Sequence, residues 1–191
     1  MDKLQTLLAD LTSSDEARAE QAIPALIELE AEALPALMDL TRSLDADSRW
    51  WALRVLAQLP HVQTGWLIPF LADPAPEVRQ CAALGLIENP DETAVQSLIH
   101  ALSDNDTMVC SLAGRALIGI GKPAVPSLIE AVKHDSQSVR IHALRALAEI
   151  RDHRAIPVLM QVIEEDSAFL GHWAKEGLER LGLDMVFLKP V

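Results

Sequence analysis

The sequence predicts an all-α protein, a right-handed α-solenoid of stacked antiparallel helix pairs with roughly 12 helices. One apolar pattern returns six times along the 191 residues, at steps of 30, 30, 31, 30 and 31 residues. A second apolar pattern follows nearly every copy of the first and keeps the same interval. Turn-forming Asp and Pro residues separate the patterns. Because each helix pair leaves an apolar face open, successive pairs are expected to stack into one continuous core.

The first helix of each repeat is clearest in the segments 78–86 (VRQCAALGL) and 139–147 (VRIHALRAL). In the second of these, Val139, Ala143 and Leu147 recur at helical spacing and predict one buried stripe. One position of this first helix is arginine in three of the six repeats. It holds, in chain order, Ala19, Arg49, Arg79, Cys110, Arg140 and Gly171.

The second helix of each repeat carries a similar apolar stripe and often begins near a proline. The corresponding segments read PALMDL, GWLIPFL, QSLIHAL, PSLIEAV and PVLMQVI. We expect Pro35, Pro126 and Pro157 to occupy first turns, where a missing amide proton costs nothing. Pro24 and Pro69 fall at other positions, so each is expected to kink or shorten its helix.

The turns between repeats hold acids that suit the free amides of the following helix. These include Asp15, Asp47, Asp73 and either Asp104 or Asp106. We predict one HEAT-like solenoid domain over residues 1–182 with an N-terminal cap helix at 3–11. Six repeats then begin near residues 15, 46, 76, 106, 136 and 167, and an apolar tail or cap covers 183–191.

Composition limits the classes of partner. The formal net charge is -12 and the sequence pI is about 4.8, so phosphate backbones and anionic membranes are repelled. We therefore expect neither nucleic acid nor membrane as a partner, and we predict a cytoplasmic protein. Cys81 and Cys110 lie on separate apolar patterns rather than in a CxxC pair, which favours buried, reduced thiols.

These patterns resemble HEAT repeats of the short bacterial type, which also occur in phycobilisome-lyase-like proteins. The likeness rests on the frames Asp-x(2-4)-Val-Arg-x-x-Ala-x-x-Ala-Leu and Ala-Ile-Pro-x-Leu-Ile and covers residues 3 to 182. It implies that first helices form an outer layer and second helices an inner one. It also implies that Arg49, Arg79 and Arg140 join a ladder with the turn aspartates.

Individual HEAT-like families make further demands on the sequence. The His-Glu pairs of deoxyhypusine hydroxylase are not matched, because His100, His142 and His172 precede Ala, Ala and Trp. Glycosylases of the HEAT-like type need a basic groove, which the acidity opposes. Phycobilin lyase subunits, which act as paired helpers of chromophore attachment, are allowed by the resemblance alone.

From the residues we predict a non-catalytic scaffold, not an enzyme, that binds a protein or peptide on an acidic concave face. Basic partners are favoured by charge. The predicted partner-binding residues are Asp39, Trp66, Phe70, His100, Asp104, Glu130, His134, Gln161 and Glu165. Trp50 and Trp51 are adjacent, so one is expected to face the core and the other the surface.

Two alternatives stay open. The first is a metal-dependent enzyme or a lyase-type helper subunit, in which His100, Asp104, Glu130 and His134 hold a divalent ion. These residues form two pairs spaced four apart on successive second helices, and a solvated polar stripe with His–carboxylate pairs is the favoured interpretation of them. Otherwise no cofactor is predicted. The second alternative is self-association through the apolar tail.

Overall fold

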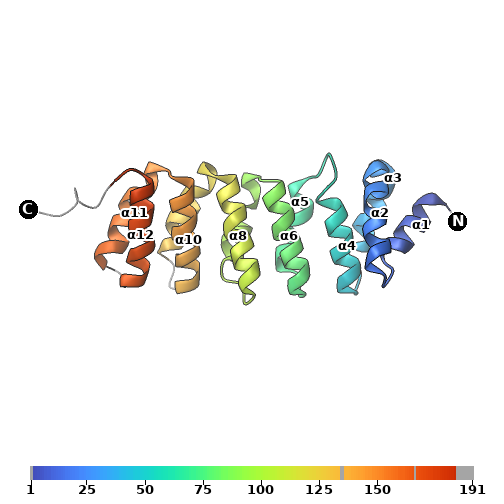
Figure 1. The fold of residues 1–191 in the computed structure, drawn as a ribbon, viewed down its shortest axis with the longest axis horizontal. Helices are drawn as coiled ribbons and strands as arrows, with labels where there is room; N and C mark the ends of the chain where they lie inside the picture. The colour runs from blue at the N-terminus through green and yellow to red at the C-terminus, as the bar shows by residue number, and fades with distance from the viewer. Residues whose placement is uncertain (1, 134–135, 166, 184–191) are drawn as a thin grey trace, which may run out of the picture. The chain divides into compact units, whose positions relative to one another are not determined.

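A computed structural model describes residues 2–133, 136–165 and 167–183, with the side chain of residue 165 excepted. Within these ranges the chain forms twelve α-helices and four 3-10 helices and contains no β-strand, which confirms the predicted fold class (Figure 1). The chain divides into two compact units, Met1–Asn89 and Pro90–Val191. Each unit consists of helix pairs packed against their neighbours along the chain.

Unit 1 begins with a single helix and continues with helix pairs. Its elements are α1 (Lys3–Leu11), α2 (Glu16–Glu28), α3 (Glu30–Leu40), α4 (Ala46–Leu56), α5 (Thr64–Leu67), the 3-10 helix η1 (Ile68–Ala72) and α6 (Pro76–Glu88). The first-type helices α4 and α6 lie side by side (Figure 1). The core between the layers is built mainly from Leu and Ala side chains that are fully buried.

Prolines account for the irregular helices of unit 1. Pro69 begins η1, so α5 contains only four residues before the chain tightens into a 3-10 turn. Pro24 lies inside α2, as expected, and α2 ends after residue 28 with one residue before α3. The expectation for Pro35 is wrong, because α3 begins five residues earlier and encloses it.

Unit 2 repeats one arrangement three times. Its elements are η2 (Glu92–Ala94), α7 (Val95–Ala101), α8 (Thr107–Ile120), η3 (Lys122–Ala124), α9 (Val125–Val132), α10 (Gln137–Ile150), η4 (His153–Ala155), α11 (Ile156–Glu165) and α12 (Ala168–Arg180). Each 3-10 turn ends in a fully buried alanine, at residues 94, 124 and 155. A side chain this small lets the turn pack closely before the second helix begins.

Side-chain caps begin several helices. Asp15 accepts hydrogen bonds from two backbone amides of α2, and Asp106 does the same for α8. At α4 the predicted cap was wrong by two residues. The side chain of Asp45 accepts a hydrogen bond from the amide of Ser48, whereas Asp47 lies in the first turn of the helix. The hydrogen bonds from Ser48 lower the pKa of the Asp45 carboxyl.

The recurrent arginine slot has a structural role in unit 1. Arg49 donates from Nε and Nη2 to both carboxylate oxygens of Asp73, at 2.8 and 2.7 Å, and both side chains are buried. Arg79 donates to the backbone oxygen of Asp73 at 2.9 Å. In unit 2 the thiol of Cys110 occupies the same slot and contacts the backbone oxygen of Asp104 at 3.2 Å. Arg79 and Cys110 thus tie α6 and α8 to the turns before them, and Arg49 ties α4 to the turn before α6.

Several organisational predictions stay predictions. The division into two units does not test the prediction of a single domain over residues 1–182. Residues 184–191 of the predicted tail lie outside the described residues. Within the described ranges no single helix is long and apolar enough to cross a membrane. Only the successive helices Thr107–Ile120 and Lys122–Val132, bent by 112°, reach that length and composition together.

Candidate functional site

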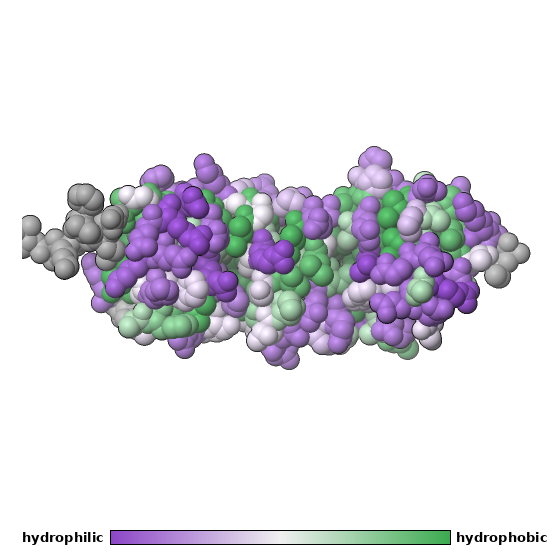
Figure 2. Space-filling view, in the orientation of Figure 1, coloured by the Kyte–Doolittle hydropathy of each residue, from purple (hydrophilic) through white to green (hydrophobic). Residues whose placement is uncertain are grey.

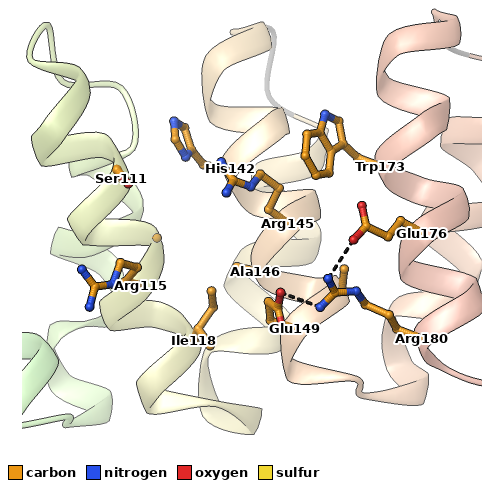
Figure 3. A pocket seen from close by; sticks show the side chains of 12 residues that line it. Ser111, Arg115, Ile118, His142, Arg145, Ala146, Glu149, Trp173, Glu176 and Arg180 are labelled. Atoms are coloured by element: carbon orange, nitrogen blue, oxygen red, sulfur yellow. Dashed lines mark hydrogen bonds and ion pairs between the residues drawn. The ribbon is translucent and has the colours of Figure 1, made fainter.

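A hollow of about 500 Å³ in unit 2 lies along the first-type helices α8, α10 and α12 (Figure 3). This size falls within the range of small-molecule sites. We call it the three-helix groove. Its lining residues are Ser111, Gly114, Arg115, Ile118, His142, Arg145, Ala146, Ala148, Glu149, Trp173, Glu176 and Arg180.

An arginine and a tryptophan form one wall of the three-helix groove. The guanidinium carbon of Arg145 lies 5.2 Å from the ring centroid of Trp173, which is cation–π distance (Figure 3). The indole Nε1 of Trp173 is buried and has no hydrogen-bond partner among the described residues. The wall thus offers a flat cationic and aromatic surface together with one unused donor.

A second arginine of the groove is neutralised by acids. Arg180 donates to Glu149 at 2.5 Å and to Glu176 at 2.8 Å (Figure 3). These contacts raise the pKa of the Arg180 guanidinium. By contrast, Arg115 and Arg145 form no ion pair with any residue that the structure describes. Their two guanidinium groups are therefore available to an anionic ligand.

His142 adds a neutral imidazole to the groove. It is half-buried on α10 and faces Gly114 of α8, where a Cβ would lie in ordinary van der Waals contact, 3.9 Å from Nδ1. Desolvation, followed by the nearby Arg145 charge, lowers the pKa of His142 below 6.5. The ring is therefore uncharged near neutral pH and offers one donor and one acceptor.

The residues predicted from sequence lie elsewhere, mostly on second-type helices. In unit 1, Asp39 is exposed on α3 and pairs with Arg42 at 3.1 Å. Trp66 and Phe70 are half-buried on α5 and η1. Trp66 precedes and Phe70 follows the change from α5 to the 3-10 helix η1.

In unit 2, His100 and Glu130 are exposed on α7 and α9, and Glu130 pairs with Lys133 at 2.8 Å. A shallow hollow of about 430 Å³ between these helices is lined by Glu130 but not by His100. Asp104 is half-buried in the turn before α8, where it accepts from the amide of residue 106 at 2.8 Å. Gln161 is exposed on α11.

The remaining predicted residues cannot be placed. His134 and the side chain of Glu165 lie outside the described residues. Among the residues that are described, no three His, Cys, Asp or Glu side chains come together to hold a metal ion. The four-residue metal site, which includes His134, and the partner-binding face both stay predictions.

The three-helix groove was not predicted from the sequence, although an alignment of the repeats contains a signal for it. One outward slot of the first helix holds Arg54, Leu84, Arg115, Arg145 and Glu176 in successive repeats. Charges at this slot look like an ordinary solvated helix face. Only the packing of Arg145 on Trp173, from different repeats, distinguishes it.

The family of the chain is established by comparison. The HEAT-repeat family model matches residues 64–130 and 104–179, which together exceed half of the sequence. The chain belongs to the HEAT-repeat family, in agreement with the resemblance seen in the sequence. Solved structures agree on the fold: the archaeal HEAT-like repeat protein of Thermococcus onnurineus NA1 is 14% identical, with a TM-score of 0.62 over 95% of this chain and 81% of that one.

A second solved relative in fold is a chain from the complex of CpcE and CpcF of phycocyanin lyase from Nostoc sp. PCC7120. It is 23% identical, with a TM-score of 0.55 over 95% of this chain and 78% of that one. Curated relatives also match part of the chain. The bilin biosynthesis protein RpcF of Synechococcus sp. (strain WH8020) is 36% identical over 47% of this chain and 44% of its own length.

The phycocyanobilin lyase subunit beta of Nostoc sp. (strain PCC 7120) is 33% identical over 51% of this chain and 48% of its own length. The chain therefore matches about half the length of each of these two curated relatives. Their names contradict our prediction that the protein is not an enzyme. That prediction relied on the lack of a recognisable catalytic motif in the sequence. In a repeat protein, exposed residues of different repeats can form a site together without any local sequence motif.

Proposed function

We propose that this chain is a subunit of a lyase that acts on a phycobilin, and that it works together with a protein partner. The observation that carries the proposal is the similarity to relatives named for bilin biosynthesis and as a phycocyanobilin lyase subunit. The word subunit in the second name indicates that the relative works in an assembly.

We place the phycobilin in the three-helix groove. A phycobilin is an open-chain tetrapyrrole with extended conjugation and two propionate side chains. Arg115 and Arg145 present two guanidinium groups that are not neutralised by acids, and guanidinium is the preferred partner of carboxylates. The indole of Trp173 supplies a flat face for the conjugated pyrroles. A groove of about 500 Å³ holds much of such a ligand while leaving part of it exposed.

His142 and Trp173 supply directional contacts to the pyrrole rings. The neutral imidazole can accept from a pyrrole N–H or donate to a terminal carbonyl, and the unused indole Nε1 can donate once its surroundings adjust. In this arrangement the chain binds and orients the chromophore. The protein partner would then present the acceptor or complete the reactive site.

The second-type helices are our proposed surface for that protein partner. Asp39 is exposed on α3 of unit 1, and His100 and Glu130 are exposed on α7 and α9 of unit 2. The overall charge of -12 favours a basic surface on the partner. Glu130→Lys is expected to weaken partner capture, whereas chromophore binding stays unchanged. Loss of both properties together would argue against separate surfaces.

Chromophore binding is tested by titrating phycocyanobilin into the purified chain and following the induced circular dichroism of the pigment. Each charge-assisted hydrogen bond contributes about 1.5 to 3 kcal/mol, so Arg145→Ala is expected to weaken binding about tenfold or more. Lys175→Ala, which removes an exposed cation of α12 that does not line the groove, is the matched control. Equal affinities for the two variants would overturn the assignment of the groove.

A further inference from the structure

An exposed leucine interrupts the charged slot of the first-type helices in unit 1. The slot that holds Arg54, Arg115, Arg145 and Glu176 in other repeats holds Leu84 on α6. This leucine is 48% exposed, although a charged residue would be readily solvated at the same position. Figure 2 shows hydrophobic surface over α6. A single exposed leucine is ordinary, so its surroundings decide whether it matters.

Leu84 borders a hollow of about 650 Å³ between α4 and α6, which we call the α4–α6 groove. Apolar atoms of Ile27, Trp50, Leu59 and Gly85 also line it. The two helices approach closely here, because a Cβ on Gly85 would lie 2.9 Å from the Cβ of Ala57. The groove therefore has a floor fixed by backbone packing.

One wall of the groove is rigidly built. Trp51 is buried at 8% exposure and Trp50 is half-buried, as expected for adjacent aromatic residues, with ring centroids 4.7 Å apart at 85°. The guanidinium carbon of Arg54 lies 5.2 and 5.9 Å from the two ring centroids, and Glu20 holds its Nη2 at 2.7 Å. Arg54 is therefore neutralised and stacked, which leaves Trp50 as a fixed apolar wall.

The charge around this apolar groove is negative. Glu88 is exposed at its rim, and the one lining arginine is already paired. Unit 1 holds 14 acidic and 6 basic residues, a formal net charge of -8. The lining residues recur about one turn apart in two segments: residues 50–59, on α4 and just after it, and residues 81–89, on α6 and just after it. Two turns of another helix, about 11 Å, match this length.

We propose that the α4–α6 groove is a docking site for a basic amphipathic helix of a partner protein. The apolar stripe of that helix covers Leu84 and Trp50, and its flanking Lys or Arg residues meet Glu88. This is the helix-in-groove mode of recognition, with the aromatic residue as the fixed anchor. The proposal is independent of chromophore binding, because the α4–α6 groove lies in unit 1 and the three-helix groove in unit 2.

The experiment uses two amidated amphipathic peptides of 18 residues with identical leucine stripes, one with lysines and one with glutamates at the polar positions. Affinity for the full-length chain is measured by calorimetry. We expect the lysine peptide to bind at least tenfold more tightly than the glutamate peptide. Leu84→Arg is expected to weaken its binding at least tenfold.

The matched control is Leu44→Arg, which adds the same charge at a fully exposed leucine outside the groove. It is expected to change affinity less than twofold, and unchanged far-ultraviolet circular dichroism shows that both variants fold. Glu88→Lys is expected to reduce the preference for the lysine peptide. The proposal is overturned if neither peptide binds, if both bind equally, or if the two arginine variants behave alike. Sedimentation of the chain without peptide is measured as well. If the parent chain forms dimers and Leu84→Arg is monomeric, a second copy of the chain, not a partner helix, fills the groove.

Discussion

Removal of the Asp73 carboxylate is expected to destabilise unit 1 strongly. Asp73→Ala removes both oxygens that accept from Arg49 at 2.8 and 2.7 Å, and it leaves the guanidinium buried without a counterion. It also removes the acceptor of the Ala75 amide at 2.9 Å. Breaking one side of a buried ion pair typically costs about 3 to 5 kcal/mol. For a chain of this size that cost lowers Tm by about 10 °C.

The exposed pair of Asp39 and Arg42, at 3.1 Å, is the matched control. Asp39→Ala is expected to cost less than about 1 kcal/mol, because solvent screens a pair this exposed. Both variants are compared with the parent chain by urea unfolding followed by circular dichroism. An equal small cost for the two variants would refute the buried-charge reasoning.

A double-mutant cycle separates the buried charge from the lost bonds. Arg49→Met combined with Asp73→Ala removes the uncompensated guanidinium and is expected to be more stable than Asp73→Ala alone. The pH dependence has a defined sign. Interaction with Arg49 and the amide of Ala75 lowers the pKa of Asp73 below 3.8 despite its burial. The stabilisation is therefore complete above pH 3.8 and is lost as the pH falls through the lower, folded-state pKa.

Three further predictions concern single sites. Gly85→Ala is expected to cost about 1 to 3 kcal/mol in urea unfolding, since the new Cβ meets Ala57 at 2.9 Å, whereas Gly171→Ala, with nothing within 4 Å, is expected to be neutral or stabilising. His142 is expected to titrate below pH 6.5 by NMR, so its substitution by Gln should remove part of the stability loss between pH 6.5 and that midpoint, and an unshifted titration would contradict its desolvation. Burial raises the pKa of the Cys81 thiol to about 12, so iodoacetamide at pH 8 is expected to modify it only after unfolding, and rapid modification of the native chain would be incompatible with that burial.

The helical architecture was predictable because the same apolar pattern occurs in every repeat, so a helix indicated clearly in one repeat is also expected in the others. The alanine and leucine stripe of segment 139–147 predicts the buried face of α10, and Val139, Ala143 and Leu147 are indeed buried there. Cap positions were less certain, since Asp45 and Asp47 both lie close enough to the start of α4. Sequence alone does not decide which carboxylate meets the free amides.

The candidate site was harder to predict, because neighbouring repeats contribute separate single residues to it. Arg145 and Trp173 lie 28 residues apart in sequence yet form one wall. Neither residue was among the partner-binding residues predicted from the sequence. The prediction that the chain is not an enzyme is contradicted by the names of the relatives.

The measurement that most directly tests the proposed function is the rate of chromophore attachment. Extract from source cells lacking this chain is mixed with phycocyanobilin and a phycobiliprotein apoprotein, and the absorbance of the coloured product is followed with and without the purified chain. If the chain is a lyase subunit, the wild-type chain accelerates product formation. The Arg145→Ala variant is then much less effective than the Lys175→Ala variant. Identical rates with and without the wild-type chain would contradict the proposed function.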